Sequence, residues 1–156
     1  MPEPDALRTL LAAQLTWADA HIDFADAAAA IAAPKRGQVP ANVAHSPWQL
    51  IEHMRLAQRD ILEFCRDPDY REAAWPDDFW PAEPAPPTAG AWDESVAAFL
   101  ADRDAMVRLI SDPANDLFAP IPWGDGQTLL REALLLADHS SYHVGQLMTV
   151  RRLLER

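Results

Sequence analysis

The sequence is poor in cysteine, in positive charge and in long hydrophobic runs. Among its 156 residues there is one cysteine, Cys65, which excludes an internal disulfide and any zinc cluster built from several thiolates. A single thiol fits a reducing cytoplasm. We expect Cys65 to fill space in the core rather than act as a nucleophile, because no basic neighbour is evident that would lower its pKa.

The shortage of basic residues excludes a further set of functions. The chain has 13 Lys and Arg against 24 Asp and Glu, a net charge of −11. This charge repels nucleic-acid phosphates and anionic lipid head groups, so we expect no nucleic acid and no membrane surface as a partner. No apolar run approaches the roughly 20 residues that cross a bilayer. The first residues, MPEPDALRTLLAAQL, lack the basic region of a secretory signal, so we expect a cytoplasmic protein.

Sustained two-residue alternation is also missing, and the sequence has helical periodicity instead. Apolar residues recur at steps of three and four in four blocks, which predict helices over residues 4–33, 47–66, 91–111 and 128–156. Connections that contain proline separate the blocks. Four long amphipathic helices predict an all-α four-helix bundle, and the length fits a single domain over residues 1–156.

Two of the helix starts carry capping signals. Ser46 is a suitable N-cap, Pro47 suits the first helical position, and Gln49 completes a capping box three residues after the serine. Thr128 is the expected N-cap of the last helix.

The connection over residues 67–90, DPDYREAAWPDDFWPAEPAPPTAG, contains prolines that forbid a regular helix or a central strand. Its aromatic side chains provide enough apolar surface for it to pack down against the bundle; they are Tyr70, Trp75, Phe79 and Trp80. Long ordered connections in small domains are uncommon and often functional.

The last helix contains LLLADHSSYHVGQL, in which His139 and His143 are one turn apart. At about 100° per residue the two side chains lie about 40° apart, in a sector that is otherwise mostly apolar. On the helix over residues 47–66, His53 also shares its sector with apolar residues. The sequence therefore predicts that three histidines from two helices converge inside the bundle, where bundles build metal sites.

Three neutral imidazoles suit a divalent transition metal, with zinc first and nickel or iron as alternatives. Three protein ligands would leave at least one coordination position for water or substrate, as in catalytic zinc sites. The alternative interpretation is that His139 and His143 only form hydrogen bonds within the core.

The expected places of two other histidines follow from their local sequence. His21 falls between Trp17 and Phe24 on the apolar face of the first helix. We expect it to be a hydrogen-bonded core histidine, with a place in the wall of the same cavity as the alternative. His45 precedes the cap of the second helix and is expected to be a turn residue.

The candidate catalytic residues are Asp60, Glu132 and Gln146. Asp60 and Glu132 lie two turns from the histidines, about 10 Å along their helices. Either could orient a ligand imidazole or act as a base, and surface or salt-bridge roles are the alternative. Gln146 is a candidate polar group of the pocket.

Three stretches resemble the DinB-like (YfiT-like) superfamily of metal-dependent four-helix bundles: HSPWQLIEHMRLAQRDILEF, WPDDFWP and GDGQTLLREALLLADHSSYHVGQL. With the helix order, the similarity extends over essentially the whole chain. The resemblance implies up-down-down-up connectivity with long Pro/Trp-rich connections, and often a homodimer. It places the metal triad of the family on His53, His139 and His143.

Characterised members of this superfamily include thiol transferases that attach bacillithiol or glutathione to electrophiles, and a mycothiol-dependent maleylpyruvate isomerase. The resemblance thus implies a metal-dependent S-transferase with a low-molecular-weight thiol as cosubstrate and a small-molecule substrate, in detoxification or stress response. No thiol-binding motif is evident in the sequence. Metal-assisted hydrolysis and a non-catalytic metal-binding stress-response bundle are the alternatives.

Overall fold

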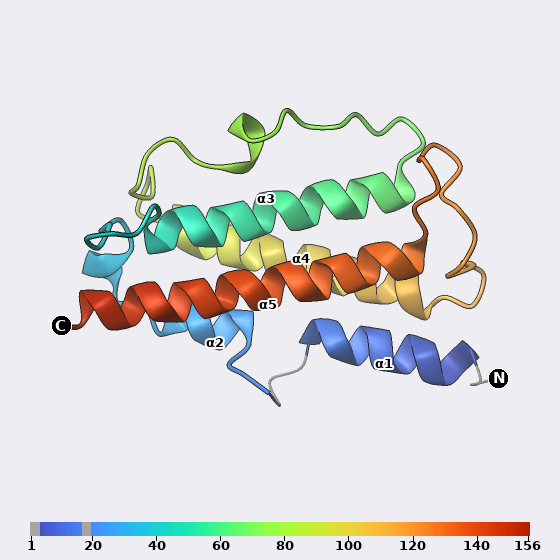
Figure 1. Cartoon of the computed structure of the whole chain (residues 1–156), viewed down its shortest axis with the longest axis horizontal. Coiled ribbons are helices and arrows are strands. Elements are labelled where there is room, and N and C mark those ends of the chain that lie inside the picture. The colour runs from blue at the N-terminus through green and yellow to red at the C-terminus, as the bar shows by residue number, and fades with distance from the viewer. Residues whose placement is uncertain (1–3, 17–19) are drawn as a thin grey trace.

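Four main helices pack side by side in an all-α bundle (Figure 1). The computed structural model describes residues 4–16 and 20–156. Its elements are α1 (Pro4–Thr16), α2 (Phe24–Ala29), the 3-10 turn η1 (Ala33–Lys35), α3 (Pro47–Arg66), the 3-10 turn η2 (Asp77–Phe79), α4 (Ala91–Ser111) and α5 (Leu129–Leu154). None of the helices in the described residues is long and apolar enough to cross a membrane.

The four main helices have the expected up-down-down-up connectivity. In Figure 1, α3 and α4 run in one direction, while α1 and α5 run in the opposite direction. Because α3 and α4 are parallel, the chain between them has to return along the length of the bundle. Residues 67–90 do so along the outer side of α3 (Figure 1).

Capping chemistry sets the starts of α3 and α5, as predicted. The Gln49 N–H donates to Ser46 Oγ at 3.1 Å, and the Ser46 N–H donates to Gln49 Oε1 at 3.1 Å. At the start of α5, Thr128 Oγ1 accepts from the Arg131 N–H at 3.2 Å. These side chains satisfy N–H groups that have no partner within the helix.

The first predicted helix is two helices in the structure, so the prediction of one continuous helix over residues 4–33 was wrong. Asp23 has extended backbone angles, φ −75° and ψ 171°, and its carboxylate accepts from the Asp26 N–H at 2.8 Å. It is therefore an N-cap that starts α2. A cap of this geometry cannot lie inside a continuous helix.

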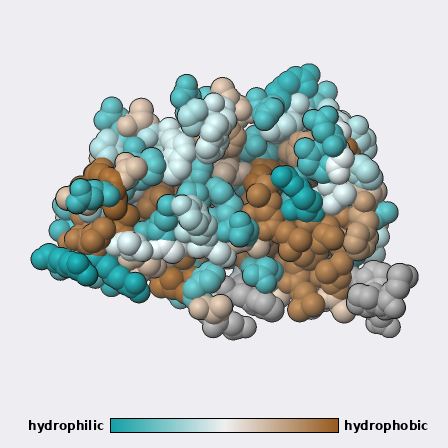
Figure 2. Space-filling view, viewed as in Figure 1, coloured by the Kyte–Doolittle hydropathy of each residue, from teal (hydrophilic) through white to brown (hydrophobic). Residues whose placement is uncertain are grey.

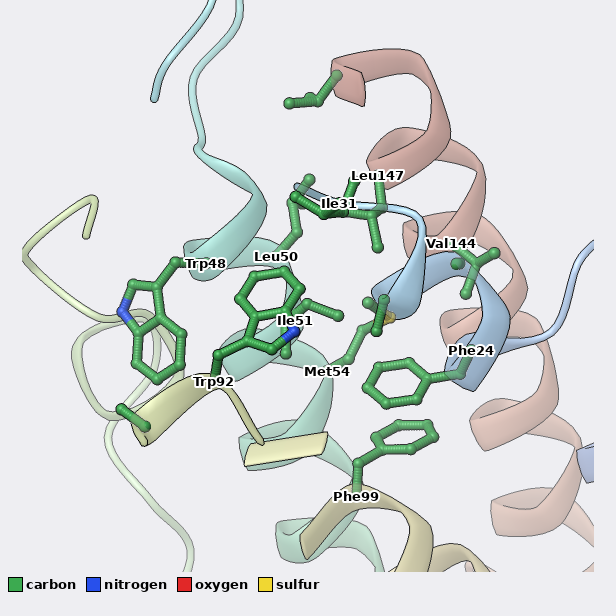
Figure 3. Packing of buried hydrophobic residues seen from close by; sticks show 14 residues of the cluster. Phe24, Ile31, Trp48, Leu50, Ile51, Met54, Trp92, Phe99, Val144 and Leu147 are labelled. Atoms are coloured by element: carbon green, nitrogen blue, oxygen red, sulfur yellow. The ribbon is translucent and has the colours of Figure 1, made fainter. Parts of the chain in front are cut away.

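Two clusters of buried side chains fill the bundle. The first joins α2, the starts of α3 and α4, and the end of α5 (Figure 3). At its centre Phe24 and Phe99 are stacked with ring centroids 3.7 Å apart. The second cluster joins α1 to the other ends of the long helices; its buried members are Leu11, Leu62, Met106, Ile110, Leu117, Leu129, Ala133 and Leu136.

Polar contacts add to the apolar packing between α3 and α4. The Ser95 hydroxyl donates to Glu52 Oε2 at 2.7 Å, and Arg59 forms an ion pair with Asp102 at 2.8 Å. These contacts fix the rotation of α3 about its axis. His53 consequently faces α5.

Candidate metal centre

Three imidazole rings meet between α3 and α5. The Nε2 atom of His53 lies 3.1 Å from Nε2 of His139 and 3.1 Å from Nε2 of His143. Each of the three residues offers a ligand atom, and these atoms all lie within 4.8 Å of one another. The structure thus brings together the three histidines that the helical faces selected.

Hydrogen bonds at the outer ring nitrogens determine which nitrogens are free. His53 Nδ1 lies 2.9 Å from the Phe79 carbonyl oxygen. A carbonyl only accepts, so Nδ1 carries the proton and Nε2 keeps its lone pair. His143 Nδ1 likewise donates to Gln146 Oε1 at 2.7 Å, while Gln146 Nε2 donates to the Tyr142 hydroxyl at 2.9 Å.

The two lone pairs of His53 and His143 face each other at 3.1 Å and repel unless a positive charge lies between them. A proton on one of the imidazoles does not supply this charge near neutral pH, because the pKa values of the rings are too low. Burial is the main cause that lowers the pKa of His53 to about 4. Burial, with the two neighbouring imidazoles, lowers the pKa of His139 to about 3. Burial also lowers the pKa of His143. All three rings are therefore neutral near pH 7, as metal ligation requires.

The nitrogen spacing fits a transition-metal ion. In a tetrahedral zinc site with Zn–N distances near 2.0–2.1 Å, neighbouring ligand atoms lie about 3.3 Å apart. The observed 3.1 Å is close to that value. In the described part of the chain no fourth His, Cys, Asp or Glu joins the group. A cation held by these three nitrogens would keep part of its shell for water or substrate.

The connection over residues 67–90 forms a roof over His53. Trp80 stacks on the His53 ring with centroids 3.7 Å apart and an interplanar angle of 5°. Phe79 is buried and supplies the carbonyl that holds Nδ1. Trp75 is 69% exposed, and its ring centroid lies 5.4 Å from that of Phe79 and 6.2 Å from that of His53. The sequence indicated that this segment would pack against the bundle, but it did not identify Trp80 as part of the centre.

Among known protein families, the profile of the DinB superfamily matches residues 4–147. The chain belongs to the DinB superfamily. No curated protein and no solved structure is significantly similar to it. The match thus extends from the start of α1 to residue 147 within α5 and includes all three histidines.

His45 of this DinB-superfamily protein has a larger role than the turn position that we expected. Its ring stacks on the other face of Trp80 with centroids 4.0 Å apart. Trp80 is therefore held between His45 and His53. This contact could not be predicted from the sequence, because the three residues come from a turn, a helix and a long connection.

His21 is exposed and is not a member of the triad, so the core placement was wrong. Its Nε2 lies 3.3 Å from Ser141 Oγ, and its Nδ1 lies 2.8 Å from the Ile22 carbonyl oxygen. The reason is the break before α2, which takes His21 out of any helix. Trp17, expected on the same face, lies outside the described residues.

Of the three candidate catalytic residues, only Gln146 reaches the imidazoles. Asp60 and Glu132 both line a separate cavity of about 330 Å³, the acidic cavity, which none of the three clustered histidines lines. Asp60 accepts from the Tyr70 hydroxyl at 2.9 Å. Glu132 is buried and accepts from Arg131 at 2.6 Å, in accord with the salt-bridge alternative.

Cys65 is partly buried and packs against the second core cluster. Burial, followed by the charge of Glu132, raises the pKa of its thiol to about 12. The thiolate is the reactive form of cysteine. Cys65 is therefore a packing residue at neutral pH, in line with the expectation from the sequence.

The lowered histidine pKa values make the stability of the metal-free protein depend on pH. Unfolded histidines titrate near pH 6.5, whereas the pKa of folded His53 is about 4. Below about pH 6.5 the unfolded chain takes up protons that the folded chain does not, so the free energy of unfolding falls. We expect the urea midpoint of the metal-free protein to decrease from about pH 7 to about pH 5, before most carboxylates titrate.

The control for this prediction is His53→Gln, which removes one of these groups and should show a smaller decrease over the same pH range. Parallel pH curves for the wild type and the variant would contradict the assignment of His53 as a buried neutral imidazole.

Proposed function

We propose that this protein is a metal-dependent S-transferase that joins a low-molecular-weight thiol, of the bacillithiol, mycothiol or glutathione type, to an electrophilic small molecule in detoxification or stress response. The observation that supports it most strongly is the convergence of three neutral imidazoles with no fourth protein ligand in the described residues. A divalent cation, zinc before nickel or iron, would supply Lewis-acid stabilisation of a thiolate there.

The residues of the chain prepare the centre for this chemistry. The Phe79 carbonyl and the Gln146 side chain each accept the Nδ1 proton of a histidine, His53 and His143 respectively. Such contacts orient the ligand rings and fix their tautomers. Trp80 covers one face of His53 and shields it from water.

Among the residues that the structure describes, no carboxylate joins the imidazole group, and this favours thiol transfer over hydrolysis. Activation of water for hydrolysis is usually assisted by a general base, and the candidate bases Asp60 and Glu132 line the acidic cavity instead. A thiolate is already a strong nucleophile. In the transfer step its sulfur forms a bond to the electrophilic carbon, the leaving group departs with the electron pair of the broken bond, and the thiol proton passes to solvent.

The test is an assay of zinc-loaded protein with glutathione, bacillithiol or mycothiol and the electrophile 1-chloro-2,4-dinitrobenzene. We expect turnover with at least one thiol, and a loss of about 100-fold or more in His53→Gln, because several kcal/mol of charge stabilisation disappear with the metal. His21→Gln, a histidine outside the triad, should retain the activity.

Three results would count against the proposal. Turnover that is unaffected by His53→Gln would remove the metal from the mechanism. Cleavage of an ester, amide or lactone without added thiol would favour metal-assisted hydrolysis instead, and no turnover with any substrate would favour a non-catalytic metal-binding bundle.

A further inference from the structure

A cavity of about 470 Å³ adjoins the metal centre on the side of the C-terminal end of α5. We call it the apolar cavity, because Val43, Leu50 and Val150 form much of its wall. Figure 2 shows apolar side chains gathered at this end of the molecule, at the left of the view. The volume falls in the range of about 300–1,000 Å³ that holds small molecules in proteins.

Gly145 lines this cavity in the interior of α5. Glycine destabilises a helix interior relative to alanine, so its presence calls for a reason. The backbone conformation of Gly145 does not require a glycine, because Gly126 is the one glycine with positive φ in the described residues. The neighbouring atoms do not require a glycine either, since a Cβ built on Gly145 meets no atom within 4 Å. The open space beside Gly145 leaves room for a molecule that is not part of the chain to approach the helix backbone.

The charge of the wall restricts what that molecule can be. Of the residues that the structure describes, no Asp, Glu, Lys or Arg lines the cavity, and His45 is the one histidine that does. Burial lowers the pKa of His45, which is therefore neutral at pH 7. Nothing in the wall would compensate a charged ligand, and the net charge of −11 repels anions in particular.

The cavity shares part of its wall with the metal centre. Gln146 and Tyr142 both line it, and Gln146 Oε1 accepts from His143 Nδ1 at 2.7 Å. The Tyr142 hydroxyl accepts from Gln146 Nε2 and keeps its own proton to donate to a ligand. A molecule in the apolar cavity would lie beside the ring of a metal ligand, with one hydrogen-bond donor at that end.

We propose that the apolar cavity binds an uncharged, largely apolar small molecule that lies against the backbone at Gly145. That this molecule is the electrophile of the transfer reaction rests on the proposed function. The binding of the molecule does not rest on the proposed function, because none of the contacts in the cavity requires the metal.

Binding is tested with the neutral fluorescent probe N-phenyl-1-naphthylamine, titrated into the full-length protein with and without zinc. Gly145→Leu places a side chain in the cavity where a Cβ has free space, so we expect it to fold with a melting temperature no lower than the wild type. The Kd of the probe should rise about tenfold or more in Gly145→Leu. Asp138→Leu adds the same side chain at an exposed position of α5 outside the cavity and should leave the Kd unchanged. An equal Kd in the wild type and Gly145→Leu would show that the probe binds elsewhere and would overturn the proposal.

The transfer assay separates this proposal from the proposed function. If the cavity holds the electrophile, Gly145→Leu should raise KM for 1-chloro-2,4-dinitrobenzene by about tenfold or more while its zinc affinity stays that of the wild type. Turnover with an unchanged KM would refute the cavity as the electrophile site and leave the proposed function standing. Probe binding that Gly145→Leu abolishes, in a protein without transfer activity, would support the cavity and refute the proposed function.

Discussion

Replacing His53 by glutamine is expected to lower the affinity of the protein for Zn²⁺ by more than about 100-fold. Loss of a residue that only orients a metal ligand costs about 10- to 100-fold, and loss of a ligand should exceed that. His53 is the one triad member on α3, so its removal leaves both remaining nitrogens on α5. Competition for zinc with a chromophoric chelator at pH 7 measures the change.

The matched control is His21→Gln, which makes the same chemical change at an exposed histidine outside the triad. It should leave the zinc affinity within a factor of two or so of the wild type, since no ligand atom is lost. Equal zinc affinities for His53→Gln and His21→Gln would contradict a metal centre between α3 and α5.

Replacing Phe99 by alanine is expected to lower the free energy of unfolding by about 3–5 kcal/mol. Phe99 is 2% exposed, stacks on Phe24, and its carbonyl accepts from the buried side chain of Gln58 at 2.6 Å. Its ring joins α2 and α4 in the first core cluster (Figure 3), so the substitution leaves a cavity between them. Urea unfolding of the metal-free protein measures the loss.

Phe118→Ala is the control for this prediction, because Phe118 is 63% exposed. Its effect on the free energy of unfolding should stay within about 0.5 kcal/mol. Losses of similar size in the two variants would show that the stack of Phe24 and Phe99 does not stabilise the fold.

Local chemistry explains why much of the fold could be predicted from the sequence. The capping box at Ser46 and the cap at Thr128 act within one helical turn, so a few neighbouring residues determine where α3 and α5 begin. The convergence of the triad is also encoded locally, since helical periodicity assigns His53, His139 and His143 to inward faces. The break before α2 was missed because the alanine-rich stretch that follows favours helix, whereas Asp23 competes for the backbone as a cap.

The cavity that a side chain lines and the contacts between distant segments could not be read from the sequence. The sequence places Asp60 and Glu132 two turns from the histidines, but only the structure shows that both line the acidic cavity, which none of the three histidines lines. The stack of His45, Trp80 and His53 joins segments up to 35 residues apart, from 45 to 80, and one of them has no periodicity. Only the folded chain brings these rings together.

The parallel arrangement of α3 and α4 has a consequence for how the centre can be altered. The 20 residues of α3 span about 30 Å, whereas the 24 residues from 67 to 90 could reach about 80 Å when extended. The segment is therefore much longer than the distance it has to span. The extra length allows Phe79 and Trp80 to pack on His53. Shortening the segment to the minimum that still joins the two helices would preserve the topology of the bundle. It would remove Phe79 and Trp80 and leave His53 uncovered.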